Sequence, residues 1–231
     1  SPRSTLDRSS AAADVYKRQH RVSANEGGPV SLTTHDIVAA GLEILDNYGL
    51  EDLSMRRLAQ LLDVKASALY WHVANKQTLL AAMADEILGA DEILGEEGQL
   101  TPTDDGGELA RELLGWAHAL RSKLLAHRDG AELVSSAMSV GLVTTDPSVQ
   151  LASFLQDCGG CDSQTARAAS QALTHLVVGH VMDEQARSQL FELNVIDTFD
   201  AEAQETEFDV GVRLLVTGIR GVSCVTKTHD A

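Results

Sequence analysis

The sequence has few aromatic residues and few prolines. Aromatic side chains make up 4% of the 231 residues, and there are four prolines, whereas strand-rich proteins are enriched in aromatic and β-branched residues. Alanine and leucine, which favour helices, are frequent instead. Hydrophobic residues still account for 44% of the chain, enough to bury the core of one large or two modest domains. The composition predicts an all-α globular protein.

Cysteine and long apolar runs are also scarce. Three cysteines do not suggest a disulfide framework in a chain of this length, and they fit a reducing compartment. No stretch approaches the about 20 apolar residues of a membrane span, and the N-terminus lacks the apolar core of a secretory signal. These absences predict a soluble, cytoplasmic protein that contacts no membrane.

Positive charge is the third deficit. Lys and Arg number 18 against 34 Asp and Glu, for a net charge of −16, so the chain as a whole is repelled by nucleic acid. Most of the excess lies in residues 91–231, which hold nine basic and twenty-three acidic side chains. Any contact with DNA must therefore come from a locally arranged surface.

Composition divides the chain into four segments. Residues 1–30 show no sustained apolar period and are expected to be a disordered arm or a vector-derived remnant. Residues 31–76 carry short helical patterns, residues 77–107 a connecting helix and a Gly-rich linker, and residues 108–231 a larger helical domain. Within the last segment, apolar periods predict helices near residues 108–127, 131–140, 147–157, 163–187 and 205–220.

The first helical segment contains two short helices joined by a tight turn. Thr33 can cap a preceding helix that stops at Tyr48, and Asn75 can cap a following long helix. Between these, Ser54 can cap a helix over residues 55–62, and a second short helix is expected over residues 65–72. Two short helices in this order form a helix-turn-helix.

Residues 54–76 resemble the DNA-reading part of the tetracycline-repressor (TetR) family. The run Leu-Tyr-Trp-His-Val-Ala-Asn-Lys at positions 69–76 is the most similar part, and the likeness extends from Ser31 to Ile87. Asp63 occupies a turn position where the family commonly has Gly, and aspartate tolerates the positive φ that such a turn can require. The resemblance implies a three-helix helix-turn-helix bundle.

The residues expected to contact DNA are Arg56, Lys65, Ala66, Ser67, Tyr70, Trp71, His72 and Lys76. Small residues let the recognition helix approach the groove, while the polar tips of Tyr70, His72 and Lys76 can hold phosphates. Arg56 stands where the family places an arginine that reads guanine. The alternative is that the charged members are solvated surface residues. Leu69 and Val73 are expected in the core.

The C-terminal part resembles the tetracycline repressors more loosely, at residues 127–131, 175–185 and 208–219. In those repressors a histidine binds the magnesium of the drug complex and an asparagine holds the drug. The matching positions here are Val134 and Trp116. Valine offers no ligand to magnesium, so magnesium–tetracycline is not the expected inducer.

An apolar pocket with an aromatic wall is predicted instead. The expected lining residues are Trp116, Leu120, Val134, Met138, Met182 and Asp183, and Asp183 could hold a cation or a donor group. The alternative is that the apolar members are ordinary packing.

Two further patterns point to metal or redox chemistry and are weaker. His180 and Asp183 share a helix face and could supply two metal ligands, but no third is evident, and a structural role is favoured for His175. Cys158 and Cys161 have zinc or redox spacing, yet they fall where an interhelical turn is expected. No metal and no cofactor are expected.

The last predicted helix carries an apolar stripe of Phe208, Val212, Leu215 and Ile219. The stripe could be buried within its own domain. The resemblance implies instead a four-helix bundle with a second copy of the chain, and hence a homodimer.

Together these features predict a ligand-responsive repressor that binds a near-palindromic operator as a homodimer and is released by a small-molecule inducer. An all-α enzyme is the main alternative, but the sequence shows no nucleophile–base set and no phosphate-binding glycine loop. A DNA-binding protein without a working pocket is another.

Overall fold

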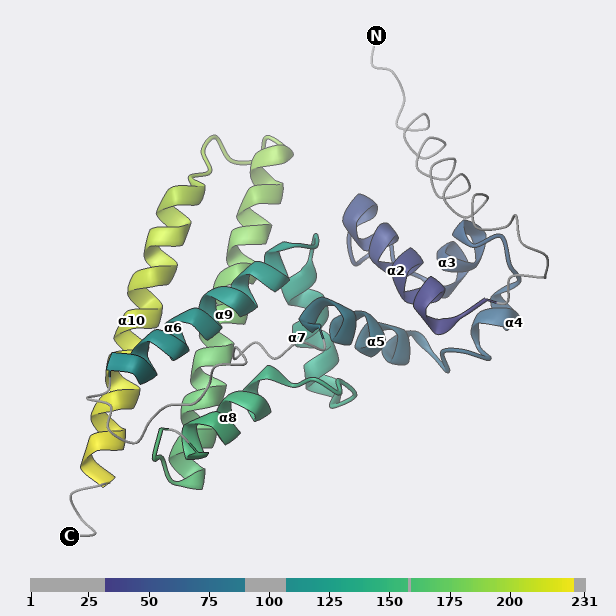
Figure 1. Cartoon of the computed structure of the whole chain (residues 1–231). Helices are drawn as coiled ribbons and strands as arrows, with labels where there is room; N and C mark the ends of the chain where they lie inside the picture. The colour runs from purple at the N-terminus through teal and green to yellow at the C-terminus, as the bar shows by residue number, and fades with distance from the viewer. Residues whose placement is uncertain (1–31, 90–106, 158, 227–231) are drawn as a thin grey trace, which may run out of the picture.

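A computed structural model describes residues 32–89, 107–157 and 159–226, and every regular element within these ranges is an α-helix (Figure 1). In chain order the helices are α2 (Thr34–Tyr48), α3 (Met55–Leu61), α4 (Ala66–Leu69), α5 (Lys76–Leu88), α6 (Gly107–Leu125), α7 (Gly130–Val140), α8 (Pro147–Asp157), α9 (Ser163–Glu192) and α10 (Ala201–Thr226). The predicted all-α fold is confirmed. Within the same ranges, no helix has the length and apolarity that crossing a membrane requires. The arm at residues 1–30, the linker from residue 95 to residue 106 and Cys158 lie outside the described residues.

Side-chain caps start the N-terminal helices at the predicted positions. The Thr33 hydroxyl accepts a hydrogen bond from the Asp36 N–H, and the Asp36 carboxylate accepts one from the Thr33 N–H, which forms a capping box. Ser54 caps α3 and Asn75 caps α5 through their side-chain oxygens. All three predicted caps are confirmed.

The second short helix is shorter than predicted. It comprises four residues, whereas the expected range was 65–72. The Leu69 carbonyl accepts hydrogen bonds from both the His72 and the Val73 N–H groups, so the chain tightens into a turn there and the helical ladder stops. Asp63, in the turn before α4, has a φ of 55°, which is the positive value that the family's glycine suggested.

Helices α2 to α5 enclose one apolar core. Its fully buried side chains include Ile37, Ile44, Leu45, Leu58, Leu69, Val73, Leu79 and Met83. This confirms Leu69 and Val73 as core residues. Gly41 allows α2 and α5 to approach closely, because a Cβ there would lie 2.8 Å from the Met83 sulfur.

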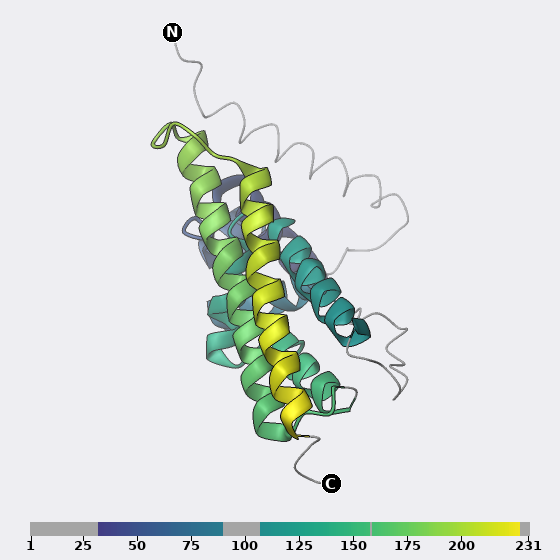
Figure 2. The same cartoon turned by 90° about the vertical axis from the view of Figure 1, so that its left-hand side faces the viewer.

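The C-terminal part is built around α9 and α10, which run side by side (Figure 2). Helix α6 packs against both of them and α8 packs along α9, while α7 packs against α5. Helix α7 therefore links the N-terminal helices to the rest of the molecule.

Helices α9 and α10 are longer than their apolar periods predicted. Helix α9 continues to Glu192 instead of ending at residue 187, and α10 begins at Ala201 instead of residue 205. Leu190 and Phe191 in the turn added to α9 are exposed, and the first turn of α10 is mostly polar, so neither turn extends a buried apolar stripe. A cap marks one of these ends, because the Asp200 carboxylate accepts a hydrogen bond from the Ala203 N–H at 3.0 Å.

The apolar stripe of α10 is buried within its own chain. Phe208, Val212 and Ile219 are buried and Leu215 is half-buried. The Phe208 ring contacts the imidazoles of His118 on α6 and His180 on α9, each with its centroid 5.3 Å away. The expectation that these residues face a second copy is wrong, because α6 and α9 of the same chain already cover them.

Candidate functional site

The expected DNA-contacting residues lie on the segment that runs from α3 through α4 to the start of α5. Of these eight positions, seven are exposed and Lys76 is half-buried. Figure 1 places α4 at an end of the molecule remote from α9 and α10. No described helix of the C-terminal part covers this surface.

Two aromatic side chains project from the end of α4. Trp71 is 85% exposed and Tyr70 is 52% exposed, although the neighbouring Leu69 and Val73 are buried. A tryptophan left in water forgoes the large hydrophobic gain that its burial would provide. Exposed aromatic side chains next to buried core residues make this segment a candidate contact surface.

The adjacent arginines of α3 have different surroundings. Arg57 pairs with Asp52, and its guanidinium carbon lies 3.8 Å from the centroid of the Tyr48 ring, so it is held within its own domain. Arg56 is exposed, and among the described residues its guanidinium has no ion pair. A guanidinium in this position can hydrogen-bond to the O6 and N7 atoms of guanine.

A cavity of about 350 Å³ lies between α7, the start of α8 and α9. Its lining residues are Ser135, Met138, Ser139, Asp146, Ser148, Gln171, Thr174, His175, Val178, Gly179 and Met182. Two of the expected pocket residues, Met138 and Met182, are among them. Sequence reasoning missed Asp146, whose position before Pro147 signals only the start of a helix.

The other expected pocket residues lie elsewhere. Trp116, Leu120 and Val134 are packed in the core, and the Trp116 side chain is only 1% exposed. The Trp116 Nε1–H is buried and has no hydrogen-bond partner among the described residues. Asp183 is exposed on α9. None of these four lines the cavity.

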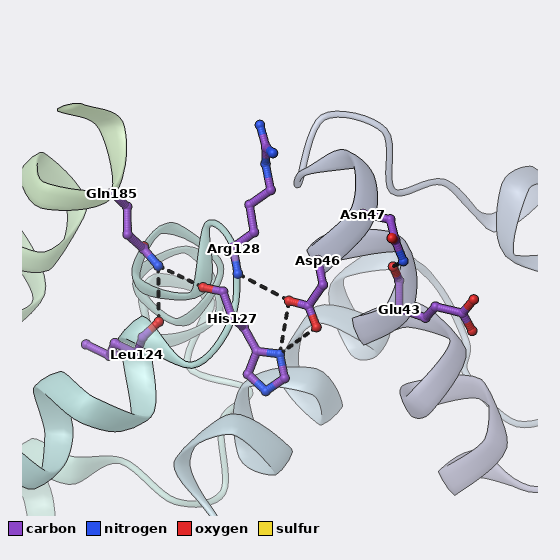
Figure 3. A network of polar contacts seen from close by, with 7 residues as sticks. All are labelled: Glu43, Asp46, Asn47, Leu124, His127, Arg128 and Gln185. Atoms are coloured by element: carbon purple, nitrogen blue, oxygen red, sulfur yellow. Dashed lines mark hydrogen bonds and ion pairs between the residues drawn. The ribbon is translucent and has the colours of Figure 1, made fainter. Parts of the chain in front are cut away.

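A polar network joins the end of α2 to the turn between α6 and α7 (Figure 3). The His127 Nδ1 lies 3.1 Å from both carboxylate oxygens of Asp46, one of which also accepts from the Arg128 N–H at 3.2 Å. Gln185 of α9 donates from Nε2 to the carbonyls of His127 at 2.7 Å and Leu124 at 3.2 Å. The network thus connects α2, the α6–α7 turn and α9.

Asp129 makes a second link at the same place. Its Oδ2 accepts from the Leu50 N–H at 2.8 Å, and its Oδ1 accepts from Gln189 of α9. Gly49 has a φ of 87°, and a Cβ there would lie 2.8 Å from the Asp129 carboxylate. The start of α7 is therefore fixed to the N-terminal helices through a close contact that requires glycine.

The other end of α7 is also attached to the N-terminal helices. Asp85 of α5 accepts hydrogen bonds on Oδ1 from the N–H groups of Thr144 at 2.8 Å and Thr145 at 3.0 Å. These two residues immediately precede Asp146 of the cavity. A displacement of α7, which forms one cavity wall, would therefore reach the helices that carry the exposed aromatic surface.

The weaker motifs have different surroundings. His180 contacts the Gln204 carbonyl through Nε2 at 3.0 Å. The structural role expected for His175 is wrong, because His175 is exposed and lines the cavity. Cys161 is buried. Among the described residues, no group of three His, Cys, Asp or Glu side chains is placed to hold a metal ion.

Two family descriptions match the chain. Residues 37–83 match "Bacterial regulatory proteins, tetR family", and residues 101–194 match "Tetracyclin repressor-like, C-terminal domain". The tetracycline repressor protein class E of Escherichia coli is 32% identical over 201 residues, which cover 81% of this chain and 90% of that protein.

Solved structures show the same similarity. The structure of BioQ with its natural double-stranded DNA operator has a TM-score of 0.62 and 37% identity, and covers 82% of this chain and 98% of that chain. A TetR variant from Acinetobacter baumannii AYE in complex with minocycline has a TM-score of 0.65 and 28% identity, with 83% and 98% covered. The chain belongs to the TetR family of bacterial transcriptional regulators, whose repressors bind operator DNA and respond to ligands.

Proposed function

We propose that the chain is a repressor that binds a near-palindromic operator as a homodimer and is released by a small molecule. The observation that carries the proposal is the exposed tip around α4, where Trp71 is 85% exposed on a fixed backbone. In this proposal residues 31–76 form the DNA-binding domain, residues 77–107 connect it, and residues 108–231 bind the ligand and dimerise.

The chemistry of the tip suits a major groove. Ala66 and Ser67 are small and exposed at the start of α4, so the helix can approach the base edges. Arg56 supplies base reading. Lys76 and those N–H groups in the first turn of α5 that the Asn75 cap leaves free contact phosphates. This local arrangement works against the net charge of −16, which keeps the rest of the molecule away from DNA.

The second copy is proposed to bind on the outer face of α9 and α10. Leu214 is 71% exposed and Val210 is 53% exposed on α10. Gly218 lies on the same exposed side, and a Cβ there would have no neighbour within 4 Å, so a partner helix can approach closely. The exposed Val210 and Leu214, one turn apart on α10, suit burial against a second copy, and two copies would present two α4 tips to successive grooves.

Control by ligand is proposed to act through α7. This helix forms one wall of the cavity. The Asp129 carboxylate attaches its start to the turn after α2, and the Asp85 carboxylate of α5 holds the chain that follows its end. A ligand that favours a shifted α7 lowers operator affinity by reciprocal coupling.

Magnesium–tetracycline is not the proposed inducer. The positions that match the drug-binding asparagine and the magnesium-binding histidine are the buried Trp116 and Val134, and neither offers an oxygen or an imidazole to magnesium. The expected result is that tetracycline with magnesium at micromolar concentration leaves a protein–operator complex intact in a gel-shift assay. Release of the operator would contradict this part of the proposal.

Binding titrations test the DNA-binding surface. A duplex selected by the protein from a random library is compared with a scrambled duplex of the same length. Arg56→Ala is expected to weaken binding to the selected duplex by about 1–3 kcal/mol and to relax preference at one base pair, while Lys76→Ala weakens both duplexes alike.

Arg57 provides the matched control. Arg57→Lys keeps its charge next to Asp52 and is expected to leave both affinities near the wild-type values, because Arg57 is held within the domain. Equal losses on the two duplexes for Arg56→Ala would remove Arg56 from base reading, and failure of the wild-type protein to select any sequence would refute the function.

A further inference from the structure

The cavity between α7, α8 and α9 has one acidic lining residue and no lysine or arginine. Asp146 is its single carboxylate, and neither lysine nor arginine is among the residues that line it. The geometry points to a binding site for an amphipathic cation, with Asp146 as the counter-charge. Only the effect of such a ligand on DNA rests on the proposed function.

One wall of the cavity is apolar and adaptable. Met138, Val178 and Met182 contribute it from α7 and α9. Methionine has an unbranched, polarisable side chain that adjusts to ligands of different shapes. This wall suits the hydrocarbon or aromatic body of a ligand small enough for about 350 Å³.

One oxygen of the Asp146 carboxylate is held by hydrogen bonds, and the other can accept from a ligand. Its Oδ1 accepts from the Ser148 N–H at 2.8 Å and the Ser148 hydroxyl at 2.7 Å, while Oδ2 has no hydrogen bond among the described residues. The preceding Thr144 and Thr145 are fixed by Asp85. A carboxylate positioned in advance binds a cation without a further ordering cost.

An anionic ligand would meet the opposite conditions. It would lie beside Asp146 without a guanidinium or ammonium group in the lining, and His175, the other titratable lining residue, is exposed to water. The net charge of −16 adds a long-range field that concentrates cations near the surface and repels anions.

The test uses three probes of similar size that differ in charge. They are benzyltrimethylammonium, its uncharged carbon isostere neopentylbenzene, and the anion phenylmethanesulfonate. Binding to the full chain is followed through the methyl NMR signals of 13C-labelled methionines. The chain has four methionines: Met138 and Met182 line the cavity, while Met55 and Met83 belong to the N-terminal helices and serve as internal controls.

The cation is expected to shift the signals of Met138 and Met182 and to leave those of Met55 and Met83 unchanged. It should bind about tenfold more tightly than the neutral isostere, since a charge pair in a partly buried site is worth roughly that factor. The anion should bind more weakly than either.

Asp146→Asn separates the contribution of the charge to ligand binding from that of the shape of the side chain. Asparagine keeps the side-chain oxygen that accepts from Ser148, so the start of α8 is preserved while the charge is lost. The variant should abolish the tenfold preference for the cation and leave the affinity of the neutral isostere unchanged. Asp157→Asn, at the exposed far end of α8, is the control and should behave as wild type.

Several results would overturn the assignment. These are equal affinities for the cation and its isostere, tighter binding of the anion, shifts at Met55 or Met83 instead of the cavity methionines, no binding of any probe, or an unchanged preference in Asp146→Asn. None of these measurements involves DNA. A protein that fails to bind an operator would refute the proposed function and leave this result standing.

Discussion

The two tryptophans show that the two parts of the molecule use large side chains in opposite ways. Trp71 is 85% exposed on the N-terminal helices, and Trp116 is 1% exposed within the C-terminal ones. In the N-terminal part, the proposed DNA-contacting residues lie on one continuous stretch of chain, and the apolar core lies beneath that stretch. In the C-terminal part, the large apolar residues are packing, and the cavity is assembled from helices far apart in sequence. Exposure therefore points to the proposed DNA-contacting residues in the first part, whereas the lining of the cavity in the second part depends on how distant helices pack.

The largest expected effect follows from the burial of Trp116. Trp116→Ala should lower the free energy of unfolding by about 3–5 kcal/mol, because a fully buried indole leaves a cavity. Trp71→Ala should change it by less than about 0.5 kcal/mol, because its side chain is exposed. Urea unfolding of both variants measures the difference. Similar losses in the two variants would remove the contrast between the two parts.

The same two variants should rank in the opposite order when the loss of operator affinity is measured instead of the loss of stability. Trp71→Ala is expected to weaken operator binding, whereas Trp116→Ala, measured where it is folded, should retain it. The Trp116 Nε1–H is buried and has no hydrogen-bond partner among the described residues. A role for Trp116 in lining a ligand pocket stays a prediction.

The sequence predicted the N-terminal part closely because its determinants are local. The caps Thr33, Ser54 and Asn75 and the positive φ of Asp63 each depend on a few neighbouring residues. The error was the length of α4. The Leu69 carbonyl accepts from both the His72 and the Val73 N–H groups, and this turn ends a helix that propensity alone would continue.

In the C-terminal part the helices were predicted well, but of the six expected pocket residues only Met138 and Met182 line the cavity. The start and end of α8 follow from local signals, yet Asp146 reaches a cavity only because α7 and α9 pack beside it. The side of α10 that faces its own chain could not be read from its apolar stripe, because a stripe packs equally well against the same chain or a second copy. The position of α6 decides between them.

The next largest effect concerns the outer face of α10. Leu214→Glu is expected to shift the protein from dimer to monomer at micromolar concentration, because two copies of a buried carboxylate would face each other across a two-fold axis, at a cost above about 2 kcal/mol. Sedimentation velocity measures the shift. Val149→Glu, at an exposed position of α8, is the control and should remain dimeric. A wild-type monomer would contradict the proposed assembly.

A smaller effect is expected where the two parts meet. Asp129→Ala removes the acceptor for the Leu50 N–H and for Gln189, and should lower the free energy of unfolding by about 1–3 kcal/mol. If α7 transmits ligand binding, the variant should also bind ligand normally while releasing operator less completely. Glu132→Ala, exposed on α7, is the control. Full release in Asp129→Ala would place the coupling elsewhere.

The smallest effect distinguishes the helix caps of the two parts. Ser54 and Asn75 cap α3 and α5 without charge, whereas the carboxylate of Asp162 caps α9. Hydrogen bonds from the Thr165 hydroxyl and N–H hold the pKa of Asp162 below its ordinary value of 3.8. A carboxylate whose pKa is lowered in the folded state stabilises the folded state fully above pH 3.8, and this contribution is lost as the pH falls through the folded-state pKa.

Asp162→Asn keeps a capping oxygen that does not titrate. Calorimetry should therefore give similar Tm values for the wild type and the variant at neutral pH. Between about pH 4 and pH 2 the Tm of the wild type should fall further than that of the variant. Parallel Tm curves would show that the charge of this cap contributes nothing.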